Sequence, residues 1–176
     1  MEKLSAYNIA FKGIKPGRHE FDYKIDSRFF DLFNESFVNE GEVDVKVILE
    51  KEALVYSLDF IFRGYVTLLC DRCLEYYNHP VSYETRAYIK FDDGHQEEDD
   101  EIIWLSHDDH QVNVSHLIYE YIVLSLPIKH VHPDGADGKS LCDPEMLKKL
   151  EQLKPDIAEP HHDNRWEELK KLINNN

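Results

Sequence analysis

Apolar and polar residues alternate strictly over three stretches in the first half of the chain. Apolar side chains occupy every second position over residues 43–49 and, after the turn-like Glu-Lys-Glu, again over 54–62. A period of two with β-branched and aromatic residues is typical of half-buried strands, so the pair predicts a long antiparallel hairpin. The second arm is expected to reach residue 70 with a bulge or kink at Gly64, and residues 81–91 are expected to return beside it.

Shorter elements precede and follow this hairpin. Two brief strands are predicted around residues 7–11 and 19–25, and Ser27 is predicted to cap a short helix that starts at Arg-Phe-Phe. Another short strand is predicted over residues 102–105. These elements extend the β-rich part of the chain on both sides of the hairpin.

The periodicity changes to helical spacing after residue 112. Apolar residues from Leu117 to Leu124 share one broad helical face, Ser115 or Asn113 can cap it, and Pro127 ends it. Glu120 lies within this helix, either at its solvent edge or as a buried carboxylate that needs a partner. Further helices are predicted from Asp143-Pro144 and from Asn164.

These elements predict an α+β fold with an antiparallel β-sheet core of long hairpins and C-terminal helices packed on or beside it. The expected organisation is a β-rich core domain over residues 1–127, which includes an acidic loop at 92–110 and a closing helix. Residues 128–176 are expected to form a loop and two short C-terminal helices.

Charge is unevenly distributed along the chain. The net charge is −15, and residues 92–145 carry 14 Asp and Glu against 2 Lys and Arg. Proteins that bind phosphates gain affinity from Lys and Arg, so this chain as a whole is poorly suited to nucleic acid. The near-neutral first half can still carry a local basic patch. The acidic surplus serves either solubility or a cationic partner.

Cys70 and Cys73, in Leu-Leu-Cys-Asp-Arg-Cys-Leu, offer three interpretations. As zinc ligands they need partners, and the candidates are His130, His132 and Cys142 in one later loop. A redox pair is disfavoured because the context is all strand and acidic neighbours raise a thiol pKa. The interpretation favoured by the sequence is two reduced thiols that shape a strand end, and zinc remains the alternative.

Other patterns limit the class of protein. The chain contains no GxSxG, Walker A or GxGxxG motif and no convincing nucleophile–base pair, which argues against an enzyme. No apolar stretch approaches the roughly 18 residues of a membrane span. The N-terminus has no apolar signal region, and three cysteines are too few for a disulfide scaffold. A reduced, cytoplasmic protein is expected.

Three blocks of the sequence resemble the YceD family, the large ribosomal RNA subunit accumulation proteins. The first block is Gly64–Glu84, the second is the helix that ends in Leu-Pro, and the third is Asp-Asn-Arg-Trp near the C-terminus. The residues that match the family are Cys70, Arg72, Cys73, Leu74, Glu120, Pro127, Arg165 and Trp166. Many members carry further cysteines after the Leu-Pro, where this chain has only Cys142 with two histidines. The resemblance implies a bacterial cytoplasmic role in large-subunit ribosomal RNA processing or accumulation, and no catalytic residue.

Two modes of action fit this resemblance. In the favoured hypothesis a non-enzymatic ribosome-biogenesis factor recruits a basic ribosomal protein or pre-ribosomal particle through its acidic residues, namely Asp99, Asp100, Glu101, Asp108 and Asp109. The alternative is direct binding of single-stranded RNA by the β face, through Arg63, Arg72, Arg86, Tyr65 and Tyr76. A zinc-stabilised interaction module is a further alternative.

Overall fold

The computed structural model describes residues 2–34, 36–52, 55–93 and 102–154. The chain divides into two compact units, Met1–Cys142 and Asp143–Asn176. The first unit contains the sheet, the two-stranded ribbon and the first helices. In the described part of the second unit, α3 (Pro144–Leu153) is capped by Asp143, whose carboxylate accepts from the backbone N–H groups of Glu145 and Met146. The predicted Asp-Pro helix start is therefore confirmed.

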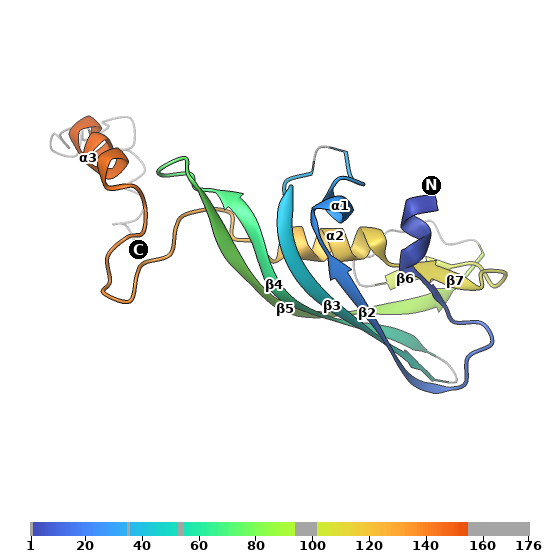
Figure 1. Cartoon of the computed structure of the whole chain (residues 1–176). Coiled ribbons are helices and arrows are strands. Elements are labelled where there is room, and N and C mark those ends of the chain that lie inside the picture. Colours follow the sequence, from blue (N-terminus) through green and yellow to red (C-terminus); the bar gives the residue numbers. More distant parts are fainter. Residues whose placement is uncertain (1, 35, 53–54, 94–101, 155–176) are drawn as a thin grey trace, which may run out of the picture. The chain divides into compact units, whose positions relative to one another are not determined.

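A five-stranded sheet forms the centre of the first unit (Figure 1). Its order is β2-β3-β4-β5-β6, and its strands are β2 (Gly17–Ile25), β3 (Glu40–Lys51), β4 (Tyr56–Leu69), β5 (Tyr76–Phe91) and β6 (Ile102–Leu105). Neighbouring strands are antiparallel except β5 and β6, which are parallel. The α+β class, the long hairpin, the returning strand and the short strand at 102–105 are confirmed.

Smaller elements close the ends of this sheet. The 3₁₀ helix η1 (Glu2–Tyr7) leads into β1 (Asn8–Ala10), which pairs with β7 (Gln111–Asn113) as a separate ribbon. The short helix α1 (Ser27–Phe30) is capped by Asp26, whose carboxylate accepts from the backbone N–H of Arg28 at 3.0 Å. The predicted Ser27 cap is wrong, because the acceptor lies one residue earlier.

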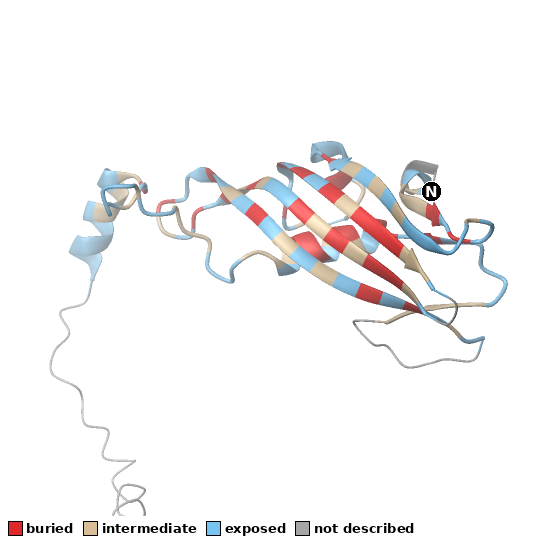
Figure 2. Cartoon of the chain, turned by 90° about the horizontal axis from the view of Figure 1, so that it is seen from below, coloured by how far each residue is buried: buried red, intermediate tan, exposed pale blue. Residues whose placement is uncertain are grey.

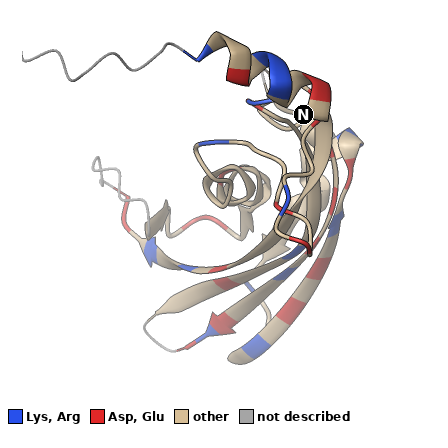
Figure 3. Cartoon of the chain, turned by 90° about the vertical axis from the view of Figure 1, so that its left-hand side faces the viewer, with Lys and Arg blue, Asp and Glu red and all other residues tan. Residues whose placement is uncertain are grey.

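The core lies between one face of the sheet and α2 (Ser115–Leu124) (Figures 1 and 3). Buried and exposed residues alternate along β3, β4 and β5, as the bands in Figure 2 show. Phe60 and Phe62 point to the helix, where the ring of Tyr121 contacts both at centroid distances of 5.2 and 6.3 Å. Glu120 is exposed, which settles the two alternatives for this carboxylate in favour of the solvent edge.

Gly64 permits a close approach between the backbones of β3 and β4. A Cβ atom at this position would lie 2.1 Å from the carbonyl oxygen of Glu42 and 2.7 Å from the Cα of Val43. The strand register runs unbroken through Gly64 on both sides, so the predicted bulge is absent from the described pairing. The glycine is needed for space rather than for an extra residue in the ladder.

Candidate metal centre at the tip of the β4–β5 hairpin

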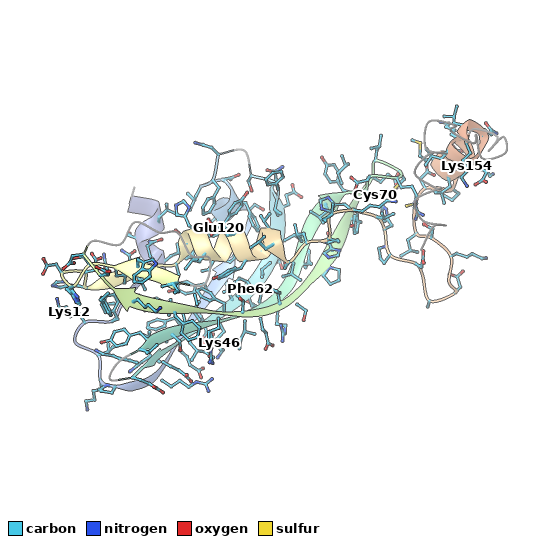
Figure 4. The ribbon with its side chains drawn as sticks, turned by 180° about the vertical axis from the view of Figure 1, so that it is seen from behind. Lys12, Lys46, Phe62, Cys70, Glu120 and Lys154 are labelled. Carbon is cyan, nitrogen blue, oxygen red and sulfur yellow. The ribbon has the colours of Figure 1, made fainter. Side chains whose placement is uncertain are left out.

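The turn between β4 and β5 directs two thiols inward. The backbone N–H of Cys70 donates to the carbonyl of Glu75 at 2.9 Å, and that of Leu74 donates to the carbonyl of Cys70 at 2.9 Å. These bonds close a tight loop at the far end of the long hairpin, where Figure 4 labels Cys70. Cys70 and Cys73 are both buried, with 0% and 3% of their surface exposed.

The loop over residues 128–142 returns to this turn and completes the cluster. Asp71 and His130 exchange two hydrogen bonds of 2.7 Å, one from the backbone N–H of Asp71 to the carbonyl of His130 and one from the backbone N–H of His130 to the Asp71 carboxylate. A second tight turn pairs Asp134 with Ser140 and brings the chain back. As a result His132 and Cys142 arrive beside the two hairpin cysteines.

Four ligand-type side chains meet here, Cys70, Cys73, His132 and Cys142, with all ligand atoms within 4.8 Å of one another. The Sγ atoms of Cys70 and Cys142 are 3.6 Å apart, and the Nδ1 atom of His132 lies 3.3 and 3.7 Å from the Sγ atoms of Cys73 and Cys142. With Zn–S bonds of about 2.3 Å, the sulfurs of a tetrahedral site lie roughly 3.7 Å apart. The donor set and its spacing therefore fit a structural Cys₃His zinc site.

Arg72 links the two halves of the cluster. It lies between the two hairpin cysteines in sequence, and its Nε donates to the Sγ of Cys142 at 3.1 Å. Its guanidinium also donates to the hydroxyl of Ser140, which in turn accepts from the backbone N–H of Cys142 at 3.2 Å. The positive charge of Arg72 stabilises negative charge on the Sγ of Cys142, which belongs to the loop over residues 128–142.

The surroundings also favour ionised thiols. Burial alone would raise the pKa of Cys70, but hydrogen bonds from the backbone N–H groups of Cys73, His132 and Arg72 lower that pKa to about 5. Burial opposes ionisation of Cys142 too, yet hydrogen bonds from Ser140 and Arg72 lower its pKa. The hydrogen bond to Cys70 raises the pKa of His132. Thiolate is the form of cysteine that ligates metal ions.

The predicted ligand set is thus brought together except for His130. His130 uses its backbone to hold the loop, while its side chain lies outside the four-residue group. Sequence reasoning missed Ser140 and the bond from Arg72 to Cys142. The signal available was weak, namely a serine two residues before a cysteine and an arginine inside the Cys-x-x-Cys pair. The favoured interpretation as two thiols at a strand end did not include the second half of this cluster.

The residues predicted to bind RNA lie in separate places. Arg63 forms an ion pair with Glu84, and Arg86 forms one with Asp59, both on the sheet face opposite α2. Arg72 belongs to the cysteine cluster. Tyr65 is half-buried on β4, whereas Tyr76 is 73% exposed at the start of β5. The set does not converge on one site.

The residues predicted to bind a partner are described only in part. Asp108 and Asp109 are exposed, and Asp109 accepts from the backbone N–H of Ser106 at 2.8 Å. Asp99, Asp100 and Glu101 lie outside the described residues, as do Arg165 and Trp166 of the third family block. Pro127 lies just beyond α2 and is exposed. The described part of the chain has no helix long and apolar enough to cross a membrane.

Comparison with known proteins supports the resemblance seen in the sequence. No curated protein and no solved structure matches the chain. The sequence model of one family, described as Large ribosomal RNA subunit accumulation protein YceD, matches residues 58–173. The match includes the whole cysteine cluster and covers more than half of the chain. The protein therefore belongs to the YceD family of large ribosomal RNA subunit accumulation proteins.

Proposed function

We propose that the protein is a non-enzymatic factor that promotes accumulation of large-subunit ribosomal RNA in the cytoplasm by binding a basic ribosomal protein. The family match carries the link to the large ribosomal subunit. The net charge of −15 supports a cationic polypeptide as the direct partner, because complementary charge raises the association rate and selectivity. Such a factor can deliver its partner to the assembling subunit and keep it off unrelated RNA.

The described cations on the sheet favour a protein partner over RNA. Figure 3 shows Lys and Arg interspersed with Asp and Glu along the strands. Lys46 contacts both Glu20 and Asp22. Arg63 on β4 and Arg86 on β5 are each paired with a carboxylate. A phosphate would have to compete with these carboxylates, and an RNA backbone requires several unengaged cations along its path.

The direct test measures binding of the purified, untagged chain to individually purified basic proteins of the large subunit and to fragments of large-subunit ribosomal RNA. Binding to a basic protein is expected to weaken as salt rises. It should weaken again when Asp99, Asp100, Glu101, Asp108 and Asp109 are replaced by their amides. Tight binding to RNA with no binding to any protein would refute the proposal.

We propose in addition that the Cys₃His cluster holds zinc as a structural ion. A bound zinc ion would join the hairpin turn to the loop over residues 128–142. Without it, the two segments meet through a few hydrogen bonds and the contact between the rings of Tyr77 and His132. Metal analysis of protein purified without a His-tag is expected to give about one zinc per chain. A value far below that would refute the zinc centre without touching the proposal about the partner.

A further inference from the structure

Apolar side chains are exposed around the metal centre, on the outside of the hairpin tip. Tyr76 and Leu74 are 73% and 63% exposed, and Leu69, which pairs with Tyr76 across the strands, is 43% exposed. Phe37, which precedes β3, is 80% exposed and lines the same groove as Leu69 and Tyr76. We call Phe37, Leu69, Leu74 and Tyr76 the tip surface. Phe37, Leu69 and Tyr76 line one groove, and Leu74 lies in the turn that leads to Tyr76. Exposed apolar side chains grouped in this way mark interaction sites more often than scattered single ones.

Leu74 is held in a backbone conformation that disfavours leucine. Its φ is +62°, and it is the one described residue other than glycine with a positive φ. The left-handed region is strained for a residue with a Cβ, and glycine would occupy it freely. Its exposed side chain buries little apolar surface in return. Strain that is not offset by packing points to a role for this side chain in a contact outside the fold.

The groove beside these residues has a definite charge. Its volume is about 690 Å³, and its lining includes Phe37, Glu40, Leu69, Asp71, Tyr76 and His130. The described lining residues include two carboxylates and neither Lys nor Arg. The adjacent Glu75 is also exposed. The surface therefore combines an apolar floor with negative charge at its edge.

We propose that the tip surface docks a cationic polypeptide segment, with an apolar side chain of the partner in the groove and its Lys or Arg residues against Glu40 and Asp71. This inference rests on the proposed function, since it places the docking site for the same basic partner. RNA suits the surface poorly because Glu40 and Asp71 repel phosphates and the described lining of the groove has no Lys or Arg to hold them. A second copy of this chain would bring its own charge of −15 to the carboxylates.

The metal centre and the tip surface share their framework. Asp71 lines the groove while its carboxylate accepts from the backbone N–H of His130, which lines it too. Leu74 directly follows the ligand Cys73, so the turn that presents one thiol inward presents the leucine outward. Loss of the metal is therefore expected to weaken docking through disorder of this framework.

The test replaces Leu74 by Gly and Tyr76 by Ala, and measures binding to the purified basic large-subunit proteins. Each variant is expected to lose at least tenfold in affinity for the protein that the unaltered chain binds. The thermal unfolding midpoint of L74G is expected to stay equal or rise by about 3 °C, because glycine relieves the strain. Tyr88→Ala is the matched control, since Tyr88 is an exposed tyrosine near the opposite end of β5.

The outcomes separate this inference from the proposed function. If the unaltered chain binds none of the basic proteins, the proposed function fails. If it binds one, and L74G and Y76A bind as tightly as Y88A, only the tip surface is refuted. A fall in the unfolding midpoint of L74G would show that leucine is needed for the fold, which also refutes the inference. Selective loss of ribosomal RNA binding, or of self-association in sedimentation, would assign the surface to another occupant and overturn it.

Discussion

The outer face of the sheet and the tip of the hairpin are built from the same two strands, yet they use arginine differently. On the sheet face, Arg63 contacts Glu84 in a pair that is more than half exposed, and Arg86 contacts Asp59, whose side chain is 23% exposed. At the tip, Arg72 contacts the Sγ of Cys142 and the hydroxyl of Ser140. The sheet arginines neutralise carboxylates of the protein itself, whereas the tip arginine contacts a cysteine of the candidate metal centre.

The difference shows where a ligand can gain free energy from this protein. A partner at the sheet face would have to displace exposed ion pairs, which individually contribute little to stability. A partner at the tip meets apolar side chains that already lie in water, beside carboxylates with no described Lys or Arg in the same groove. The candidate metal centre and the exposed apolar side chains therefore lie at the same end of the hairpin.

The largest expected effect comes from a change at the metal centre. Replacing His132 by Ala is expected to abolish stoichiometric zinc, because three thiolates remain around an incomplete tetrahedron. The folded state of the first unit is expected to lose roughly 5 kcal/mol or more, since the free energy of binding a structural zinc ion is part of the free energy of folding. Metal analysis and denaturant unfolding measure the two quantities.

His130→Ala is the matched control for that variant. His130 lies in the same loop, but only its backbone is used to hold the loop to Asp71. The H130A variant is expected to keep its zinc and most of its free energy of unfolding. The reverse pattern, with zinc lost from H130A and kept by H132A, would show that the ligand set described here is incorrect.

A change at Gly64 probes the sheet itself. Gly64→Ala is expected to destabilise the protein by about 3 kcal/mol, because the new Cβ would collide with backbone atoms of β3 that cannot move without breaking the ladder. Urea unfolding of the zinc-saturated protein measures this loss. Zinc content should be unchanged, so the variant separates stability of the sheet from chemistry at the tip.

Gly13→Ala serves as the control for Gly64. Gly13 and Gly64 both have a positive φ, of 96° and 156°, but no atom lies within 4 Å of the position that a Cβ of residue 13 would occupy. Its substitution introduces backbone strain without a collision, and a loss of about 1 kcal/mol is expected. Equal losses at both positions would mean that the close approach of β3 and β4 is unimportant.

Removal of the tip arginine is expected to have an intermediate effect. Three thiolates and a neutral imidazole around Zn²⁺ carry a net charge of −1, which Arg72 compensates at a buried site. Arg72→Met should therefore lower zinc affinity by roughly 10- to 100-fold. This is the loss expected when a group that orients a metal ligand and stabilises its negative charge is removed. Competition with a chromophoric chelator measures the affinity.

Cobalt substitution supplies a second readout for Arg72. Loss of the N–H···S bond should shift the sulfur-to-metal charge-transfer band of the Co²⁺ form, which a purely structural role would leave in place. The same change at Arg63, which pairs with a carboxylate on the sheet face, should alter neither the band nor the affinity. Equal affinities for R72M and R63M would remove Arg72 from the centre.

The sequence predicted the parts of the fold that depend on local pattern. The alternation that predicted the long strands is a property of consecutive residues, and the short strand at 102–105 was placed with the bounds of β6. The parallel pairing of β6 with β5 and the ribbon of β1 with β7 depend on contacts between distant residues, and no local pattern encodes them. The Asp26 cap was missed because Asp26 and Ser27 are both good N-cap residues.

The candidate site also combines features visible in the local sequence with features that depend on contacts between distant residues. The Cys-x-x-Cys pair is visible as a local motif, and its possible partners were limited to one loop. The choice of His132 over His130 was not visible, because it depends on two hydrogen bonds that fix the position of the loop. One joins the backbones of Asp71 and His130, and the other runs from the backbone N–H of His130 to the Asp71 carboxylate. The contact that joins Ser140 to the hairpin half of the site comes from Arg72, 68 residues away in the chain.

The smallest expected effect belongs to the sheet face, where Arg63→Met breaks the ion pair with Glu84. Both side chains are more than half exposed, so water and salt screen the attraction and little is lost when it is removed. The free energy of unfolding is expected to change by less than about 1 kcal/mol, and by less still in high salt. Urea unfolding at two salt concentrations measures this, with the zinc-saturated parent as reference. A loss as large as that of Gly64→Ala, unaffected by salt, would mean that the charges of the sheet face stabilise the fold. The sheet face and the tip would then not differ in how much their charged groups contribute to the free energy of unfolding.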